Sequence, residues 1–343
     1  MLSILRRCLG ALAISLAITS AAQAQLPALG AIANQQARRL ATLYPGRMTG
    51  SPAEILAADF IHQRLQQWGY QSDIRRFPAR YAYQGPGPRQ TWRSVTGSSV
   101  IAAREGREPK QIVIVAHLDT YAAQSERDDA ANLGGLTLQG MDDNAVGVGV
   151  LLELAARFQA IPTRYTLRFI ATSGEEEGQL GANNILQYMD LQQQKNTLLV
   201  INLDELVGGT RLYFTSGLHT PAAERKRTRD RALALARRYG IPASTPPAKA
   251  QHALDNSDAQ PFDQAGLPVL NVNATDWALG NKDGVQQRAK SRAFPDGIVR
   301  HYAQRDSQQY LDTQLPGRIA QRCQQTVQIL LPLIKSLAQA ERT

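Results

Sequence analysis

At 343 residues the chain is long enough for one large α/β domain or two small ones. Hydrophobic residues make up 43% of the chain and charged residues 20%, a balance that excludes a mostly disordered or fibrous protein. The formal net charge of +9 comes from basic residues scattered along the chain. Because no nucleic-acid-binding module accompanies them, we expect no nucleic acid as a partner.

The first 24 residues have the features of a cleavable signal peptide. Arg6 and Arg7 supply a positive start, residues 9–18 form an apolar run, and Ala22 and Ala24 are the small residues that a signal peptidase recognises. The apolar run is shorter than the roughly 20 residues that span a bilayer, which disfavours a membrane anchor. We therefore expect export to the periplasm, no stable membrane insertion, and a single domain over residues 25–343.

Predicted strands and helices alternate along the rest of the chain. Apolar residues at helical spacing predict the helices, and uninterrupted β-branched runs predict strands that are covered on both faces. In chain order we predict helices at 31–43 and 52–68, strands at 99–103 and 111–116, a helix at 145–158, a strand at 167–171, a helix at 181–188, a strand at 198–203, a helix at 221–239, a strand at 269–272 and a helix at 318–340. This alternation predicts an α/β fold, with a doubly wound, mixed but mostly parallel central sheet and helices on both faces.

Cys323 is the one cysteine outside the predicted signal peptide, since Cys8 lies within it. The mature protein would therefore have no internal disulfide, and it would be stabilised by its core and by any bound metal. Cys323 lies in an apolar helical pattern near the C-terminus, so we expect it to be buried.

Four clusters of polar side chains lie where an α/β sheet builds its active site. Three of them follow a predicted buried strand, and the fourth opens the predicted helix at residue 145. The clusters are His117 with Asp119, Asp142 with Asp143 and Asn144, Glu175 with Glu176, and Asp204. The carboxyl ends of neighbouring strands meet at one edge of such a sheet, and like-charged carboxylates gather there only with a counter-charge. Histidine with several carboxylates and no thiolate suits Zn²⁺, with cobalt or manganese as alternatives.

Each cluster taken alone has a structural explanation. His117 fits a buried histidine, residues 142–144 fit a helix cap, residues 175–177 fit a solvated acidic turn, and Asp204 fits a turn at the end of a strand. Together these explanations require four coincidences at the same edge of the sheet, so we favour the metal site.

The ordered clusters resemble the signature of the two-zinc aminopeptidases of the M28 family. The matching stretches are Ala-His-Leu-Asp-Thr (116–120), Gly-Met-Asp-Asp-Asn-Ala (140–145), Ser-Gly-Glu-Glu-Glu-Gly (173–178), Ile-Asn-Leu-Asp (201–204), Ser-Asp (257–258) and Gly-Leu-Pro (266–268). Residues 45–50 and 280–284 further resemble periplasmic members that trim basic residues, notably arginine, from exported proteins. The resemblance covers most of the mature chain, and it implies a zinc aminopeptidase whose substrate is the N-terminus of a peptide or protein.

The resemblance also implies a ligand set for two zinc ions per chain. His117 would bind one ion, and Asp143 would bridge both, because it directly precedes the Asn-Ala pair of the motif. Glu176 and Asp204 would complete the two sites, although the sequence leaves open which ion each of them serves.

Two further carboxylates match catalytic positions of the family. Glu175 matches the general base, which accepts a proton from the attacking water and passes it to the leaving amine. Asp119 matches the carboxylate that orients His117, a support that metal-binding histidines require.

The last ligand in the family is a histidine that follows the final core strand. His301 is the only histidine between Val269 and the C-terminus, so we assign it this role, with His252 as the alternative. The residues after His301 depart from the commoner family pattern. Val146 and Ala259 also differ from the residues that are frequent at their positions.

Asp258 is our candidate for recognition of a basic substrate side chain. It belongs to a segment that leads into the predicted strand at 269–272, and its carboxylate could pair with a guanidinium in bidentate geometry. The alternative is that Asp258, like Asp255, Asp276 and Asp283, is a loop aspartate that faces water. The predicted specificity for N-terminal Arg or Lys therefore depends chiefly on the resemblance.

Other functions fit parts of the sequence. A metallocarboxypeptidase or a one-zinc glutaminyl cyclase could use the same fold, but the cyclase would not need His117 as a ligand for a second zinc. A periplasmic binding protein fits the signal peptide, the length and the fold, yet it leaves the carboxylate clusters unexplained. A catalytically dead member of the fold would be expected to have lost ligands. The oligomeric state is not readable from the sequence.

Overall fold

The computed structural model describes residues 26–247, 254, 256–275, 277, 294, 297 and 299–339. The predicted signal peptide lies outside the described residues, and so do His252 and residues 280–284.

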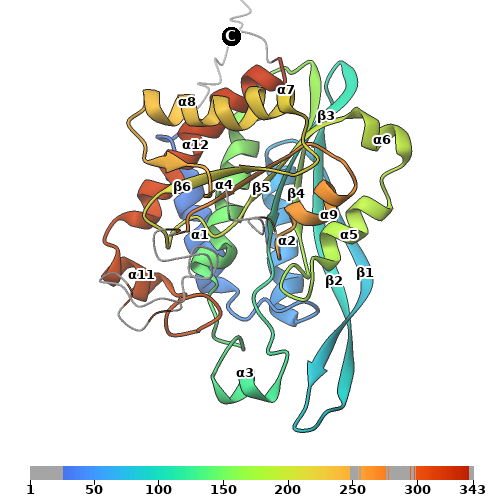
Figure 1. The fold of residues 1–343 in the computed structure, drawn as a ribbon, viewed down its shortest axis with the longest axis vertical. Coiled ribbons are helices and arrows are strands. Elements are labelled where there is room, and N and C mark those ends of the chain that lie inside the picture. Colours follow the sequence, from blue (N-terminus) through green and yellow to red (C-terminus); the bar gives the residue numbers. More distant parts are fainter. Residues whose placement is uncertain are drawn as a thin grey trace, which may run out of the picture.

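An eight-stranded mixed sheet forms the centre of the molecule (Figure 1). Its strands are β1 (Gln71–Gln84), β2 (Gln90–Arg104), β3 (Glu108–His117), β4 (Tyr165–Thr172), β5 (Thr197–Leu203), β6 (Leu212–Ser216), β7 (Ala243–Ser244) and β8 (Val269–Asn273). They lie side by side in the order β1-β2-β4-β3-β5-β8-β6-β7. The four central strands, β4, β3, β5 and β8, are parallel, and antiparallel pairs flank them on both sides. The predicted fold class is confirmed.

Helices cover both faces of the sheet (Figure 1). One face carries α1 (Ala31–Leu43), α2 (Pro52–Gln67), α4 (Val146–Phe158), α8 (Arg231–Arg238) and α12 (Arg318–Leu337), and the other carries α5 (Leu180–Gln187), α6 (Leu191–Asn196) and α9 (Ala259–Gln264). A hydrophobic core lies on each face of the sheet, and strand β3 contributes side chains to both. Ile112 and Ile114 pack in one core, while Val113 and Val115 pack in the other. This double burial is what the uninterrupted apolar run of β3 predicts.

Five short helical elements lie between the larger elements along the described chain. They are α3 (Glu126–Ala130), η1 (Met141–Ala145), α7 (Ala222–Arg225), η2 (Lys226–Asp230) and α11 (Gln308–Gln314). The helix predicted at 221–239 is thus formed by α7, η2 and α8 in succession. Cys323 is free and buried in α12, as expected. Within the described ranges, no helix combines the length and apolar character that crossing a membrane requires.

The antiparallel hairpin formed by β1 and β2 is the main difference from the prediction. The sequence predicted no strand at 71–84, and it predicted only the end of β2. Most side chains of the hairpin are exposed or half-buried, so the apolar pattern that identifies buried strands is missing there.

Candidate metal centre

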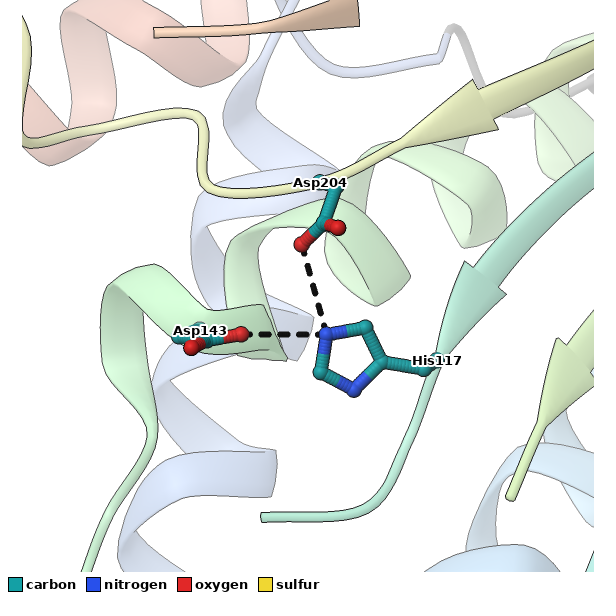
Figure 2. Close-up of side chains that lie close together, drawn as sticks. All are labelled: His117, Asp143 and Asp204. Atoms are coloured by element: carbon teal, nitrogen blue, oxygen red, sulfur yellow. Dashed lines mark hydrogen bonds and ion pairs between the residues drawn. The ribbon is translucent and has the colours of Figure 1, made fainter. Parts of the chain in front are cut away.

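Three predicted ligands meet at the carboxyl edge of the sheet (Figure 2). His117 ends β3, Asp204 follows β5, and Asp143 lies in η1 immediately before α4. The Nε2 atom of His117 lies 3.0 Å from Oδ1 of Asp143 and 3.3 Å from Oδ1 of Asp204. Figure 2 shows both carboxylates directed at the same imidazole nitrogen. We call these three residues the first group.

Asp143 also belongs to a second group, which contains Glu176 and His301. The Nε2 atom of His301 lies 3.1 Å from Oε2 of Glu176 and 3.5 Å from Oδ2 of Asp143. In each group the ligand atoms lie within 4.8 Å of one another, close enough to share one cation. The geometry therefore pairs Asp204 with His117 and Glu176 with His301, a division that the sequence left open.

His301 is brought to this site, whereas two other described histidines are not. His62 lies 2.9 Å from the hydroxyl of Ser72, and His219 pairs with Asp263 at 3.3 Å. The alternative ligand His252 lies outside the described residues.

The charges of the two groups are those of a cation site. Although burial opposes it, the surrounding carboxylates raise the pKa of His117 and of His301 well above the usual range. Buried oxygen atoms of Asp119, Glu175 and Glu176 have no hydrogen-bond partner among the described residues. A bound cation would satisfy these oxygens and balance the carboxylates. Two imidazoles and three carboxylates, without a thiolate, fit zinc.

Asp119 lies next to His117, as predicted. The Nδ1 atom of His117 is 3.2 Å from the backbone oxygen of Asp119 and 3.6 Å from its Oδ1. The other carboxylate oxygen, Oδ2, accepts a hydrogen bond from the backbone N–H of Glu176 at 3.3 Å. Asp119 thus contacts one residue of each group, a position from which it can orient the imidazole.

Glu175 lies beside both groups without belonging to either. Its side chain is buried, and burial raises its pKa well above the usual range. The charges of His117, Asp204 and Glu176 also act on it. A buried carboxylate with a raised pKa beside candidate metal ligands is suited to proton transfer.

Asp258 is buried and does not face water. One of its carboxylate oxygens accepts a hydrogen bond from the hydroxyl of Thr172, at the end of β4, and burial raises the pKa of Asp258 to about 7. The interpretation of Asp258 as a water-facing loop aspartate is therefore wrong. The other loop aspartates considered with it, Asp255, Asp276 and Asp283, lie outside the described residues.

An ion network that was not predicted from the sequence connects the segments that carry the ligands. Arg300 contacts Asp142, with Nε 3.4 Å from Oδ2, and Glu205, with Nη1 2.8 Å from Oε1. Each of these three residues directly adjoins a different candidate ligand in the sequence. The network therefore connects the three segments that carry Asp143, Asp204 and His301.

Asp306 holds the turn that carries Asp143, and it was also missed. Its carboxylate accepts hydrogen bonds from the backbone N–H groups of Asp142 at 2.7 Å and Asp143 at 3.1 Å. The side chain of Asn144 donates to the backbone oxygen of Leu203 at 2.8 Å, which ties the same turn to the end of β5. Nothing in the local sequence distinguishes Asp306 from an ordinary loop aspartate.

The segment between β3 and η1 supports the second group. The ring of Tyr121 stacks on His301, with centroids 4.1 Å apart and an angle of 5° between the planes. Gln124 donates from Nε2 to the backbone oxygen of Glu176 at 2.6 Å, and Gly134 donates from its N–H to the backbone oxygen of His301 at 2.7 Å. The contacts of Tyr121 and Gly134 support His301, whose backbone has a left-handed conformation, φ 66°, that is uncommon for a histidine.

Comparisons with known proteins decide the family. Residues 99–327 match the model of peptidase family M28. The chain belongs to peptidase family M28. It is 56% identical over 344 residues to the alkaline phosphatase isozyme conversion protein of Escherichia coli (strain K12), a match that covers 99% of this chain and 100% of that protein. It is also 34% identical over 65 residues to aminopeptidase YwaD of Bacillus subtilis (strain 168), or 19% of this chain and 14% of that protein. The M28 chain is a zinc metallo-aminopeptidase, a hydrolase of peptide bonds.

Solved structures share its fold. The zinc aminopeptidase BSAP from Bacillus subtilis superimposes with a TM-score of 0.67 at 14% identity, over 91% of this chain and 96% of that one. A glutaminyl cyclase from Porphyromonas gingivalis superimposes with a TM-score of 0.65 at 16% identity, over 90% of this chain and 98% of that one. At these identities the likeness shows the fold alone, so the details of the reaction must be argued from the residues.

Proposed function

We propose that this M28 chain is an exported aminopeptidase that uses two zinc ions, one in each group, and removes basic residues from the N-termini of peptides or proteins. The observation that carries the proposal is the position of Asp143 between two histidines. One of its oxygens lies 3.0 Å from His117 and the other lies 3.5 Å from His301. A one-zinc cyclase would need a single group, so two groups that share a carboxylate favour the two-zinc hydrolase.

Glu175 is the proposed general base. When bound, zinc lowers the pKa of a coordinated water towards neutrality and polarises the scissile carbonyl. Glu175 would take a proton from the attacking water and return it to the leaving amine. Burial raises the pKa of Glu175 above its usual range, which strengthens the carboxylate as a base for the proton of the attacking water.

Asp258 is proposed to supply specificity for Arg or Lys. One of its oxygens, Oδ1, is buried without a hydrogen-bond partner among the described residues. A guanidinium that reached this oxygen would satisfy it with a charge-assisted hydrogen bond. The many carboxylates around Asp258 would also attract the positive α-amine of a free N-terminus. Export to the periplasm is proposed from the pattern of the first 24 residues.

A panel of aminoacyl chromogenic substrates, assayed with and without a chelator, tests the proposed function. We expect hydrolysis of arginyl and lysyl substrates, loss of activity in chelator, and recovery with zinc or cobalt. Elemental analysis should give about two zinc ions per chain, one for each ligand group. Full activity in chelator, with no bound metal, would contradict the mechanism.

A further inference from the structure

The hairpin of β1 and β2 extends past the edge of the sheet at which the candidate metal centre lies. Strand β2 pairs with β4 only from Val100 to Arg104, next to the level of His117. Residues 90–98 continue beyond this edge and pair only with β1. At about 3.3 Å per residue they reach roughly 30 Å past it. In Figure 1 the hairpin, in cyan, extends below the body of the molecule on the same side as α3.

This hairpin is strongly basic. Between residues 71 and 104 the chain has one acidic residue, Asp73, and six arginines, namely Arg75, Arg76, Arg80, Arg89, Arg93 and Arg104. A hairpin that carries this much positive charge beside the candidate metal centre favours anionic ligands.

A groove of about 870 Å³ lies between the hairpin and the start of α2. Arg76 and Arg80 line it on the hairpin side, where Arg76 pairs with Ser98 and Arg80 with Ser94 across the two strands. The described residues that line this groove include no acidic side chain. Ile55, which is 42% exposed, lines its α2 side. The groove thus combines two guanidinium groups with an exposed apolar wall.

Exposed aromatic surface continues from the groove along the hairpin. Trp92 is 56% exposed, and the guanidinium carbon of Arg80 lies 4.8 Å from the centroid of its ring. The ring holds the arginine by a cation–π contact, which limits the number of conformations that the guanidinium would lose on binding a ligand.

Thr49 links the groove to the metal centre. Gly50 lines the groove and directly follows Thr49, whose hydroxyl donates to Oε2 of Glu177 at 2.6 Å. Glu177 in turn directly follows Glu176 of the second group. These contacts connect the Gly50 wall of the groove to the segment that carries Glu176.

We propose that this groove binds an acidic stretch of the substrate, located a few residues after the N-terminal residue that is removed. This inference rests on the proposed aminopeptidase function and adds a substrate class to it, namely peptides and proteins with an acidic region near the N-terminus. Carboxylates pair with guanidinium groups in bidentate geometry, and apolar parts of the segment would cover Ile55 and Trp92.

Two peptides with the same N-terminal residues, one followed by a Glu-rich stretch and the other by a Gln-rich stretch, test the inference. We would compare the intact enzyme with an Arg76→Gln, Arg80→Gln double variant. The KM for the Glu-rich peptide should rise by about fivefold or more in the double variant, as expected for the loss of two partly exposed ion pairs. The kcat, the KM for the Gln-rich peptide and the hydrolysis of a single-residue chromogenic substrate should not change. An Arg237→Gln, Arg238→Gln double variant, with exposed arginines on α8, is the matched control.

Binding of an N-acetylated, fluorescent Glu-rich peptide separates failure of this inference from failure of the proposed function. The blocked peptide cannot be cleaved, so its anisotropy reports the groove even in an enzyme that hydrolyses none of the substrates. Equal affinity of the intact enzyme and the double variant would overturn the inference, and so would equal KM values for the two cleavable peptides. If circular dichroism shows that the double variant is unfolded, the inference is tested instead by the salt dependence of the intact enzyme's preference for the Glu-rich peptide. The advantage of the Glu-rich peptide must then shrink as ionic strength rises.

Discussion

Tyr121 and His301 stack with ring centroids 4.1 Å apart and planes 5° from parallel. This contact distinguishes the two ligand groups. The first group has His117 and Asp204 at the ends of buried strands, whereas the side chain of His301 is 34% exposed and its backbone is held by loop contacts. We therefore expect the first group to bind zinc more tightly than the second, because its ligands are positioned by the rigid sheet.

The first prediction follows from this difference. Tyr121→Ala should lower the affinity of the second zinc by about tenfold or more, since residues that orient metal ligands contribute this much. Competition with a chromophoric chelator would measure the two affinities. His301→Ala should show a larger loss at the same site, and His219→Ala should show none. Two zinc ions bound as tightly in Tyr121→Ala as in the intact protein would mean that the stacking does not position His301.

The second prediction separates the adjacent residues Glu175 and Glu176. Glu175→Gln keeps the size of the side chain but cannot accept a proton, so kcat should fall by roughly 10² or more while two zinc ions stay bound. Glu176→Gln should instead weaken zinc binding, because Glu176 belongs to the second group. Steady-state kinetics and elemental analysis of both variants provide the measurement. If the two results are exchanged, the roles of the two residues are exchanged as well.

The buried central strands β3, β4, β5 and β8 and the candidate ligands were predictable from the sequence because each depends on local patterns. Strand β3 is an uninterrupted apolar run, and His117 comes at its end. The roles of Arg300 and Asp306 arise from contacts with residues more than 90 positions away in the sequence, and no local sequence pattern predicts such contacts. The division of ligands into two groups likewise depends on where the loops lie in space.

The third prediction concerns pH and the buried carboxyl of Glu54. Burial raises the pKa of Glu54 to about 7, although hydrogen bonds from Ser173 and from the backbone N–H of Ser98 oppose the rise. An unfolded chain would give a glutamate a pKa of about 4.3. Between these two pKa values the folded state holds a proton on Glu54 that the unfolded state has lost. The contribution of Glu54 to stability therefore falls as the pH rises through this window, and it is constant above the window.

Glu54→Gln should remove this pH dependence. In metal-free protein, the unfolding free energy should fall between pH 5 and pH 8 by up to about 3 kcal/mol less in Glu54→Gln than in the unmodified chain. Denaturant unfolding at the two pH values gives both quantities, and the exposed Glu126→Gln on α3 is the control. An unchanged pH dependence in Glu54→Gln would show that the buried carboxyl is ionised in the folded protein across the whole range.

The fourth prediction concerns Asp258 and the preference for basic residues. Asp258 ends a short segment before α9, and the hydroxyl of Thr172 holds one of its oxygens. The other oxygen, Oδ1, is buried and has no partner among the described residues, which is costly for a carboxylate unless a ligand supplies one. A substrate guanidinium would supply it, and the bidentate geometry of Arg would favour arginyl over lysyl substrates.

Asp258→Asn keeps an acceptor for Thr172 but removes the negative charge. The kcat/KM for an arginyl substrate should fall by about tenfold, which corresponds to one charge-assisted hydrogen bond, while the value for a leucyl substrate stays nearly constant. Asp263→Asn is the matched control, because Asp263 is also buried but binds the backbone N–H groups of Leu218 and His219 instead. An equal loss for both substrates would make Asp258 a support of the metal centre and not a determinant of specificity. A preference for leucyl substrates in the unmodified enzyme would refute the basic specificity itself, yet it would leave the two zinc groups and the role of Glu175 untouched, because neither depends on the substrate side chain.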